Sequence, residues 1–119
     1  MTDIVRLVTN ARRGRAVMHN RVLYVGGQAA SDRTQGIEGQ TAEALTKLEK
    51  VLLEAGTDMD HLLTAQIWLK DISRDFVGFN EVWDTRIGFH VAPARATAQC
   101  EMGAPDVLVE IIVTAAMPV

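Results

Sequence analysis

Small or apolar residues and polar residues alternate along residues 92–102 with a period of two. This period is typical of a β-strand, in which successive side chains point to opposite faces of a sheet. Pro93 suits the start of such a strand, because proline has no N–H group for the ladder. One face then carries Ala94, Ala96, Ala98, Cys100 and Met102, and the other carries Arg95, Thr97, Gln99 and Glu101. The pattern predicts a strand that presents Arg95 near its beginning, next to a loop.

A guanidinium in that place has two interpretations. Its five donors form a fixed fork that suits a carboxylate or a phosphate, which makes Arg95 a candidate binding residue. A simple surface ion pair is the alternative, and the pattern by itself favours it.

Shorter runs predict strands in the N-terminal part of the chain. Residues 4–8 are expected to form an edge strand, and residues 16–18 and 21–25 two strands joined by a tight turn at 19–20. Residues 9–15 are rich in arginine and are expected to form a loop.

Two glycines, Gly26 and Gly27, follow the strand expected at residues 21–25. Missing side chains at such a place indicate either a special backbone angle or a close approach by a ligand. No Gly-Lys-Ser/Thr sequence follows them, so this is not a phosphate-binding loop.

The period changes to that of an amphipathic helix over residues 37–55. Its inner stripe consists of Thr41, Leu45, Leu48, Leu52 and Ala55. Gly56 follows, as expected for a helix that ends in a glycine C-cap. Asp58 or Asp60 is expected to cap the short turn that comes next.

A strand is predicted over residues 63–69, where Ala65, Ile67 and Leu69 alternate with Thr64, Gln66 and Trp68. A second helix is expected to start at Ser73 or Asp75 and to end at Gly88. Its apolar positions are Phe76, Phe79, Val82, Trp83 and Ile87.

The last predicted element, residues 107–115, is an almost continuous apolar run and is expected to be a strand buried on both faces. Two helices can cover only one face of a sheet of five or six strands. The other face needs a partner, so we expect a homo-oligomer in which sheet faces pack together.

Glu110 interrupts this apolar run, with Leu108 and Ile112 as its neighbours on the same face. A carboxylate in such surroundings acquires a cation, hydrogen bonds or a proton. If the last two strands are antiparallel neighbours, Arg95 or a residue of another subunit could supply the cation. A structural ion pair and a functional site both remain open.

Composition narrows the class of protein. A net charge of −3 and 5% aromatic residues argue against a general nucleic-acid binder. No run is long enough to span a membrane, and the N-terminus lacks a signal-peptide pattern. The single cysteine fits a reducing cytosol, so we expect a cytoplasmic protein with one domain over residues 1–119.

Other reactive side chains are weaker candidates. The three histidines, His19, His61 and His90, lack metal-ligand spacing and are expected on the surface. Cys100 is interpreted as an inert core thiol rather than a nucleophile. Trp68 and Trp83 are expected in the core or in an interface.

Several short motifs, in order and with characteristic spacing, resemble one known family. They are Ala16-Val17, Val22-Leu23-Tyr24-Val25-Gly26-Gly27-Gln28, Gln40-Thr41, Trp68-Leu69-Lys70-Asp71-Ile72, Asn80-Glu81-Val82-Trp83, Pro93-Ala94-Arg95 and Val109-Glu110-Ile111. The chain resembles the RidA/YjgF family of reactive-intermediate (enamine/imine) deaminases. The resemblance implies a two-layer, chorismate-mutase-like α+β fold: a mixed sheet of five or six strands, with two helices on one face. It also implies a homotrimer with a ligand cleft at each subunit interface.

The resemblance also assigns roles to residues. The arginine matching Arg95 grips the carboxylate of a 2-imino acid, and the glutamate matching Glu110 holds or polarises a water molecule. Main-chain groups at Gly27 and Thr97 line the pocket; many members have cysteine at the latter position. Neither a metal nor an organic cofactor is required. Many members have a tyrosine in the cleft where this chain has Arg13, which bears on substrate identity.

Two functions of different classes follow. The first is hydrolysis of 2-imino acids to 2-keto acids and ammonia, in which Arg95 orients the substrate and Glu110 positions water. The second is a non-catalytic module that binds a small carboxylate as a metabolite sensor or partner regulator. The presence of both Arg95 and Glu110 favours the enzyme, because a carboxylate binder would need only the first. Neither function involves nucleic acid or a membrane.

Overall fold

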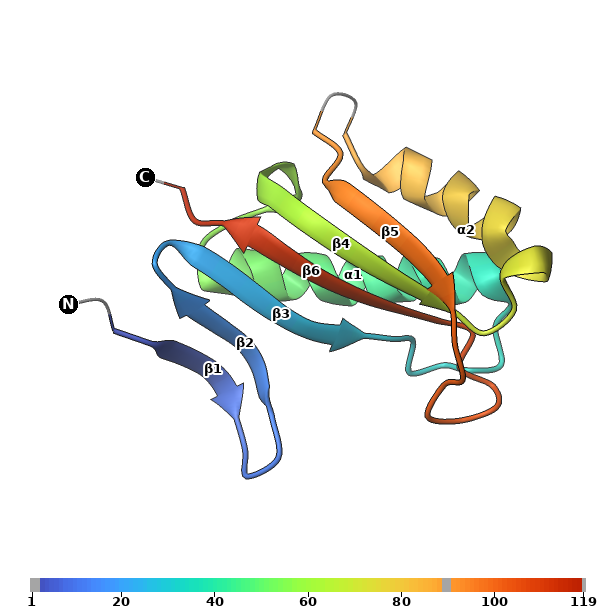
Figure 1. The fold of residues 1–119 in the computed structure, drawn as a ribbon, viewed down its shortest axis with the longest axis horizontal. Coiled ribbons are helices and arrows are strands. Elements are labelled where there is room, and N and C mark those ends of the chain that lie inside the picture. The colour runs from blue at the N-terminus through green and yellow to red at the C-terminus, as the bar shows by residue number, and fades with distance from the viewer. Residues whose placement is uncertain (1–2, 89–90, 119) are drawn as a thin grey trace.

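The computed structural model describes residues 3–88 and 91–118. Its elements, in chain order, are β1 (Val5–Thr9), β2 (Gly14–His19), β3 (Val22–Gln28), α1 (Ile37–Ala55), a 3₁₀ turn (Met59–His61), β4 (Leu62–Leu69), α2 (Ile72–Arg86), β5 (Ala94–Gln99) and β6 (Val109–Ala116). The six strands form one sheet in the order β1-β2-β3-β6-β4-β5 (Figure 1). β4 and β5 are parallel, and the other neighbouring strands are antiparallel.

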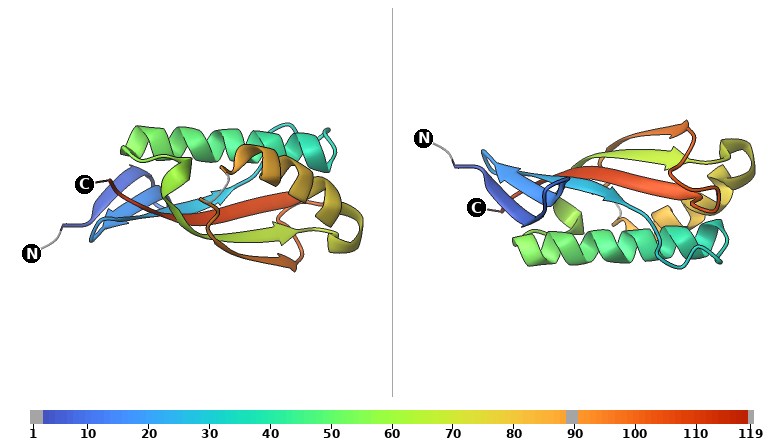
Figure 2. Two further views of the ribbon diagram at one scale, coloured as in Figure 1. Left: turned by 90° about the horizontal axis from the view of Figure 1, so that it is seen from above. Right: turned by 90° about the horizontal axis from the view of Figure 1, so that it is seen from below.

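Both helices lie on the same face of this sheet, as the two edge-on views show (Figure 2). The predicted α+β fold, with two layers and a mixed sheet of five or six strands, is therefore confirmed, and among the described residues the number of strands is six. Within the two described ranges, no helix is long and apolar enough to cross a membrane.

The inner stripe of α1 forms the centre of the core. Thr41, Leu45, Leu48 and Leu52 are completely buried against the sheet. Gly56 ends the helix with a φ of 97°, a left-handed conformation that costs glycine little because it has no Cβ. The helix and its glycine cap thus form as the sequence predicts.

β4 shows the predicted alternation. Ala65, Ile67 and Leu69 are buried beneath the helices. Trp68 points to the opposite face, where 37% of it is exposed. Trp83, in contrast, is buried, with its ring centroid 5.8 Å from that of Phe79. Only one of the two tryptophans therefore belongs to the core of the chain.

β6 lies in the middle of the sheet, between β3 and β4, but its two faces differ. Val109, Ile111, Val113 and Ala115 are buried, whereas the residues between them are only partly buried. Burial on both faces is therefore wrong for the single chain, because the helices cover one face only. That a second copy covers the other face remains a prediction.

Several predicted boundaries are wrong. β2 begins at Gly14, so the end of the expected arginine-rich loop belongs to a strand. The turn between β2 and β3 is centred on Asn20 and Arg21, which have φ values of 52° and 66°, one residue later than expected. Asp71, rather than Ser73 or Asp75, caps α2 by accepting a hydrogen bond from the Arg74 amide.

The turn before β4 follows one of its two predicted alternatives. Asp58 is the cap, and its carboxylate accepts hydrogen bonds from the Asp60 amide and from the ring of His61. His61 and His19 are partly exposed, and His90 lies outside the described residues.

The alanine face of β5 is exposed, and its polar face lies toward the helices, which is the reverse of what the composition of the two faces suggests. Ala94, Ala96 and Ala98 are exposed on the uncovered face of the sheet. Cys100 lies just beyond the strand, partly exposed, with its Sγ 3.8 Å from Met102 Sδ. The interpretation of Cys100 as a core thiol is therefore wrong. The small side chains of β5 mark a surface that this chain does not cover.

Candidate functional site

A polar hollow of about 270 Å³ lies where the end of β3, the start of β2 and α1 come together. It is lined by Arg13, Arg15, Gly27, Gln28, Ala29, Lys47 and Glu110. Three of the five predicted site residues, Arg13, Gly27 and Glu110, are thus brought together.

The Glu110 carboxylate packs directly against Gly27. A Cβ atom on Gly27 would overlap Glu110 Oε1 and would lie 2.8 Å from its Cδ and 3.0 Å from its Cγ. Gly27 lies in β3 at a register irregularity between Val25 and Gln28, and its φ is not in the left-handed region. A special left-handed backbone angle, one of the two explanations predicted for the glycine pair, is therefore wrong for Gly27. The close approach there is made by the Glu110 side chain, and approach by a ligand stays a prediction.

Glu110 itself is partly buried at the rim of the hollow. Among the described residues, its carboxylate has neither an ion pair within 4.0 Å nor a hydrogen bond. A carboxylate in this position has free lone pairs directed at a space large enough for small molecules.

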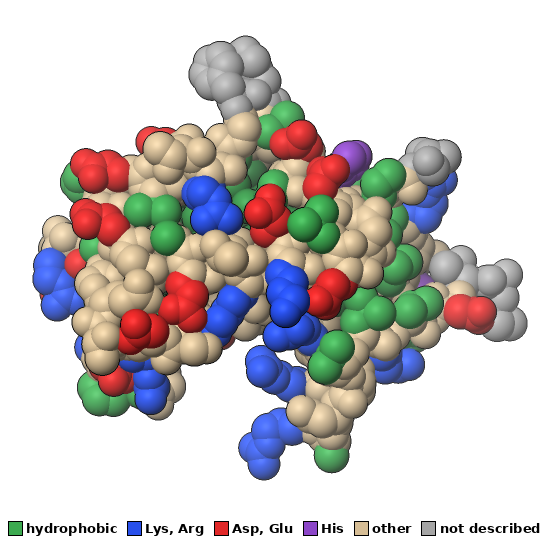
Figure 3. All heavy atoms as spheres, turned by 180° about the vertical axis from the view of Figure 1, so that it is seen from behind, with side chains coloured by type: hydrophobic (Ala, Val, Ile, Leu, Met, Phe, Trp, Pro, Cys, Tyr) green, Lys and Arg blue, Asp and Glu red, His purple; other side chains and the backbone are tan. Residues whose placement is uncertain are grey.

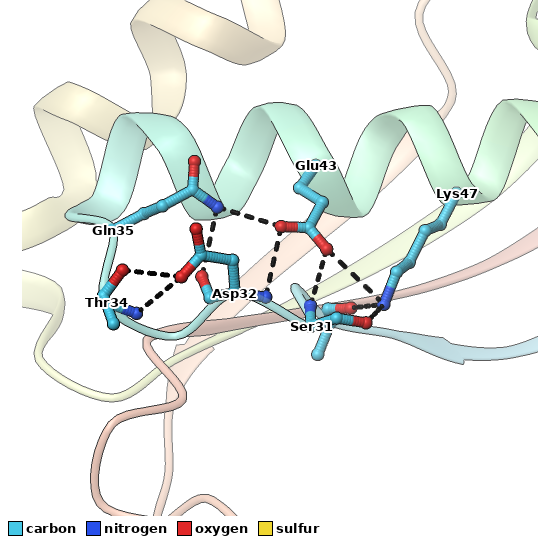
Figure 4. A network of polar contacts seen from close by, with 7 residues as sticks. Ser31, Asp32, Thr34, Gln35, Glu43 and Lys47 are labelled. Atoms are coloured by element: carbon cyan, nitrogen blue, oxygen red, sulfur yellow. Dashed lines mark hydrogen bonds and ion pairs between the residues drawn. The ribbon is translucent and has the colours of Figure 1, made fainter.

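A network of polar contacts joins α1 to the loop after β3 and includes Lys47, which lines the hollow (Figure 4). Glu43 on α1 accepts hydrogen bonds from the amides of Ser31 at 2.6 Å and Asp32 at 3.3 Å, and from Gln35 Nε2 at 2.9 Å. The hydrogen bond from the Ser31 amide is the main reason that the pKa of Glu43 lies below its ordinary value. The network ties the loop after β3 to the helix.

Lys47 follows Glu43 by one helical turn and completes this network. Its Nζ donates to Ala29 O at 2.8 Å and to Ser31 Oγ at 2.5 Å. The ammonium is therefore fixed at the hollow instead of extending into solvent, where its place outside the apolar stripe of the helix would put it.

Arg95 lies in a different environment. Its guanidinium carbon is 5.4 Å from the ring centroid of Phe79 and 5.2 Å from that of Trp83, both on α2. Burial lowers the pKa of Arg95, and the nearby Asp84 opposes that shift. Arg95 stays a cation, since an arginine side chain is not deprotonated in proteins. Among the described residues it has no ion-pair partner within 4.0 Å, so a surface ion pair is not its role in this chain.

Arg95 and Glu110 do not meet within one chain. β4 separates β5 from β6, and the register places Arg95 beside Ala65 on the helix-covered face. Glu110 is beside Trp68 on the uncovered face. The expectation of an antiparallel β5–β6 pair joining the two is therefore wrong, because β5 pairs with β4 in parallel. Arg95 of the same chain is therefore not the cation for Glu110, and a residue of another subunit stays a prediction.

Thr97 lies two residues after Arg95 and shares its face of β5. Its Oγ1 is buried and has no hydrogen-bond partner among the described residues. The side chain thus leaves a donor available on the same face as the guanidinium.

Gln40 is a residue whose role sequence reasoning missed. Its Nε2 donates to Gln35 O at 3.0 Å and to Asp106 O at 2.9 Å, and its Oε1 accepts from the Leu108 amide at 3.0 Å. These bonds fix the segment that enters β6 two residues before Glu110. A polar residue next to the apolar stripe of a helix was the available signal, because a buried amide needs partners.

Comparison with known proteins agrees with this architecture. A family model described as endoribonuclease L-PSP matches residues 4–117. The RutC family protein YoaB of Escherichia coli is 35% identical over 114 residues, which cover 96% of this chain and 98% of that protein.

Solved structures give the same result. The crystal structure of an uncharacterized protein from Pseudomonas aeruginosa superposes with a TM-score of 0.94 at 34% identity, covering 98% of this chain and 100% of that one. A YjgF family member from Neisseria meningitidis has a TM-score of 0.92 at 32% identity, covering 98% and 97%. With a family match along nearly its whole length and relatives above 30% identity, the chain belongs to the YjgF/RidA family, whose family model carries the description endoribonuclease L-PSP.

Proposed function

We propose that this protein hydrolyses 2-imino acids to 2-keto acids and ammonia at a site shared by two copies of the chain. The observation that carries the proposal is the Glu110 carboxylate, held against Gly27 at the rim of a polar hollow without a protein partner among the described residues. A partly buried carboxylate in such a place is a candidate base or water-positioning group.

The positions of the two principal residues support a shared site. Arg95 and Glu110 lie on opposite faces of one sheet, so a substrate held by both must touch two chains. β5 is an edge strand, and its small residues Ala94, Ala96 and Ala98 leave the uncovered face open for close packing. In the proposed arrangement, a second copy packs on the uncovered face of the sheet and places its own Arg95 at the hollow of the first. Following the family resemblance, we propose a closed homotrimer with three such sites.

The chemistry needs no nucleophilic side chain. The guanidinium of Arg95 holds the substrate carboxylate through two parallel hydrogen bonds, and main-chain groups at Gly27 and Thr97 line the pocket. Glu110 accepts a hydrogen bond from a water molecule beside the imine carbon. The water oxygen attacks the carbon of the protonated imine and forms a neutral carbinolamine, and Glu110 takes the proton that the water loses.

The same carboxyl group then returns that proton to the nitrogen. The C–N bond breaks, ammonia leaves, and the hydroxyl proton passes to solvent water, which gives the 2-keto acid and leaves Glu110 as a carboxylate. One water molecule is consumed for each ammonia released, and no oxidant or reductant takes part. Orientation of the carboxylate and of one water molecule lowers the entropic cost of the attack.

The test is the rate of keto-acid release from freshly generated 2-iminopropionate and 2-iminobutyrate, with and without the protein. An amino acid oxidase generates the imines in place, and catalase removes the peroxide. We expect the protein to accelerate release. No acceleration by a folded trimer would contradict the proposal and favour the non-catalytic carboxylate-binding module.

A further inference from the structure

The hollow that contains Glu110 carries more positive charge than Glu110 can neutralise. Its lining contributes three cations, Arg13, Arg15 and Lys47, and one carboxylate. Glu43 lies 3.7 Å from Lys47 and offsets only that charge. Among the described residues, neither Arg13 nor Arg15 has a carboxylate within 4.0 Å. Like charges gathered without a partner favour an anion from solution.

A hydrogen-bonded turn at Asn10 holds the backbone of the segment that carries these arginines. Asn10 Oδ1 accepts hydrogen bonds from the amides of Arg12 at 2.8 Å and Arg13 at 2.9 Å, and the Asn10 amide donates to Arg13 O at 2.9 Å. This closed turn fixes the backbone as the chain enters β2. Arg13 and Arg15 are two residues apart and line the hollow, whereas Arg12 does not. Figure 3 shows basic side chains gathered where the β1–β2 hairpin leaves the body of the molecule.

The remaining lining of the hollow favours polar substrates over aliphatic ones. Besides the charged residues it consists of Gly27, Gln28 and Ala29, which offer no large apolar surface. An aliphatic side chain of a substrate would therefore bury little apolar surface against this lining and gain little free energy from it. A second carboxylate would gain charge-assisted hydrogen bonds.

We propose that this site selects 2-imino acids that carry a second carboxylate, such as the imines of aspartate and glutamate. The inference rests on the proposed function, since it names the substrate class of the same site. Arg95 of one copy holds the carboxylate next to the imine carbon. Arg13 and Arg15 of the other copy hold the second carboxylate, and Lys47 adds positive charge at the wall.

The test compares kcat/KM for the imines of aspartate and glutamate with kcat/KM for 2-iminopropionate and 2-iminobutyrate. We expect the wild-type protein to prefer the dicarboxylic imines. Arg13→Gln should lower the dicarboxylic-to-monocarboxylic ratio about tenfold, the effect of losing one charge-assisted contact. Arg13→Tyr should shift the ratio further, because an aromatic ring packs against short apolar side chains. Arg12→Gln is the matched control: it removes the same charge one residue away, outside the hollow, and should leave the ratio unchanged.

The outcomes separate this inference from the function on which it rests. If the wild-type protein hydrolyses both classes but neither Arg13 variant changes the ratio, the inference is overturned and the imine hydrolysis stands. If the protein accelerates neither class, the proposed function fails. Calorimetric binding of 2-oxoglutarate and 2-oxobutyrate then tests whether the charged hollow selects ligands with a second carboxylate. A preference for 2-oxoglutarate that Arg13→Gln removes would support the charged hollow, and equal binding would overturn it.

Discussion

Glu110 occupies the space that a side chain on Gly27 would need. The two residues lie on the neighbouring strands β6 and β3, at the register irregularity that interrupts their pairing. The carboxylate is held at this place because one residue of the facing strand has no side chain. The location of Glu110, the proposed base, therefore depends on the absence of a side chain at Gly27.

Gly27→Ala should abolish most of the imine-hydrolysing activity while the protein stays folded. The new methyl group would overlap the carboxylate and force Glu110 into another rotamer, away from the substrate. Because the φ of Gly27 is one that alanine tolerates, and Glu110 can move toward solvent, we expect a cost of no more than about 2 kcal/mol in unfolding free energy. Gly103→Ala is the control, since a Cβ there meets no atom within 4 Å. Full activity in Gly27→Ala would mean that Glu110 need not occupy this place.

Arg95→Lys should reduce kcat/KM by about a hundredfold, because a single ammonium cannot form the paired hydrogen bonds of a guanidinium. The loss of stability should be about 1 kcal/mol, the scale of a cation–π contact with Phe79 and Trp83. Thermal unfolding and the mass of the assembly distinguish the two effects. Arg86→Lys controls for the arginine-to-lysine exchange itself, because Arg86 on α2 contacts Ala42 and Glu49 of α1 and no predicted site residue. Unfolding of Arg95→Lys would instead identify Arg95 as a structural residue.

Glu110→Gln should lower kcat by about a hundredfold or more, the usual contribution of a general base. The amide is almost the same size as the carboxylate and still forms hydrogen bonds, so we expect the fold and the assembly to persist. Steady-state ammonia release measures the effect. The control is Glu101→Gln, in an exposed residue beyond β5. Unchanged turnover in Glu110→Gln would reduce Glu110 to a structural role.

Glu43→Gln should loosen the loop between β3 and α1. The charged oxygens of Glu43 accept from two loop amides, and the neutral amide of glutamine is a weaker acceptor. Hydrogen exchange at the amides of Ser31 and Asp32 should therefore become faster. Glu49→Gln, also on α1 but bonded to Arg86, should leave these amides protected.

The hydrogen bond between the Ser31 amide and Glu43 should make the stability of this loop depend on pH. The pKa of Glu43 is lower in the folded chain than in the unfolded one, because the Ser31 amide stabilises the charged form. The contribution of the Glu43 carboxylate to the free energy of unfolding is thus fully present above the ordinary glutamate pKa. It is lost as the pH falls through the folded-state pKa. Protection of the Ser31 amide should decrease over that acidic range in the wild-type protein and stay constant in Glu43→Gln. An equal decrease in both would assign the effect to another group.

The elements of the fold could be predicted from the sequence because local patterns specify them. The stripe of α1, the glycine at position 56 and the alternation of β4 each act within a few residues. The order of the strands could not be predicted in this way, because it depends on which strand inserts between β5 and β6. The assumption that β5 and β6 are neighbours led to the wrong pairing of Arg95 with Glu110 in a single chain.

The candidate site was predicted only in part, for a similar reason. Gly27, Glu110 and Arg13 were identified from residue type and family motifs. Lys47 has the spacing of a solvent-exposed helix residue, and only the folded loop brings Ala29 and Ser31 to its ammonium. Contacts of this kind join residues 16 to 18 positions apart, beyond the reach of any period in the sequence.

The opposite orientation of Arg95 and Glu110 leads to a complementation test of the two-copy site. Arg95→Ala and Glu110→Ala, made in separate chains with different affinity tags, should each be inactive as homotrimers. Co-expression followed by purification on both tags isolates only mixed trimers. Around a closed ring of three, every mixed arrangement contains one interface in which the intact Glu110 of one chain meets the intact Arg95 of the next.

We therefore expect mixed trimers to recover about one third of the wild-type activity per trimer, as the symmetry of a three-membered ring requires. Two differently tagged copies of Arg95→Ala, purified in the same way, should remain inactive and control for the purification. If both residues served a site within one chain, no mixture could contain an intact site. Inactive mixed trimers that are correctly assembled by mass would thus contradict the shared site, and an assembly of another size would contradict the trimer. Recovery near one third would require that Arg95 and Glu110 act on one substrate from two different chains.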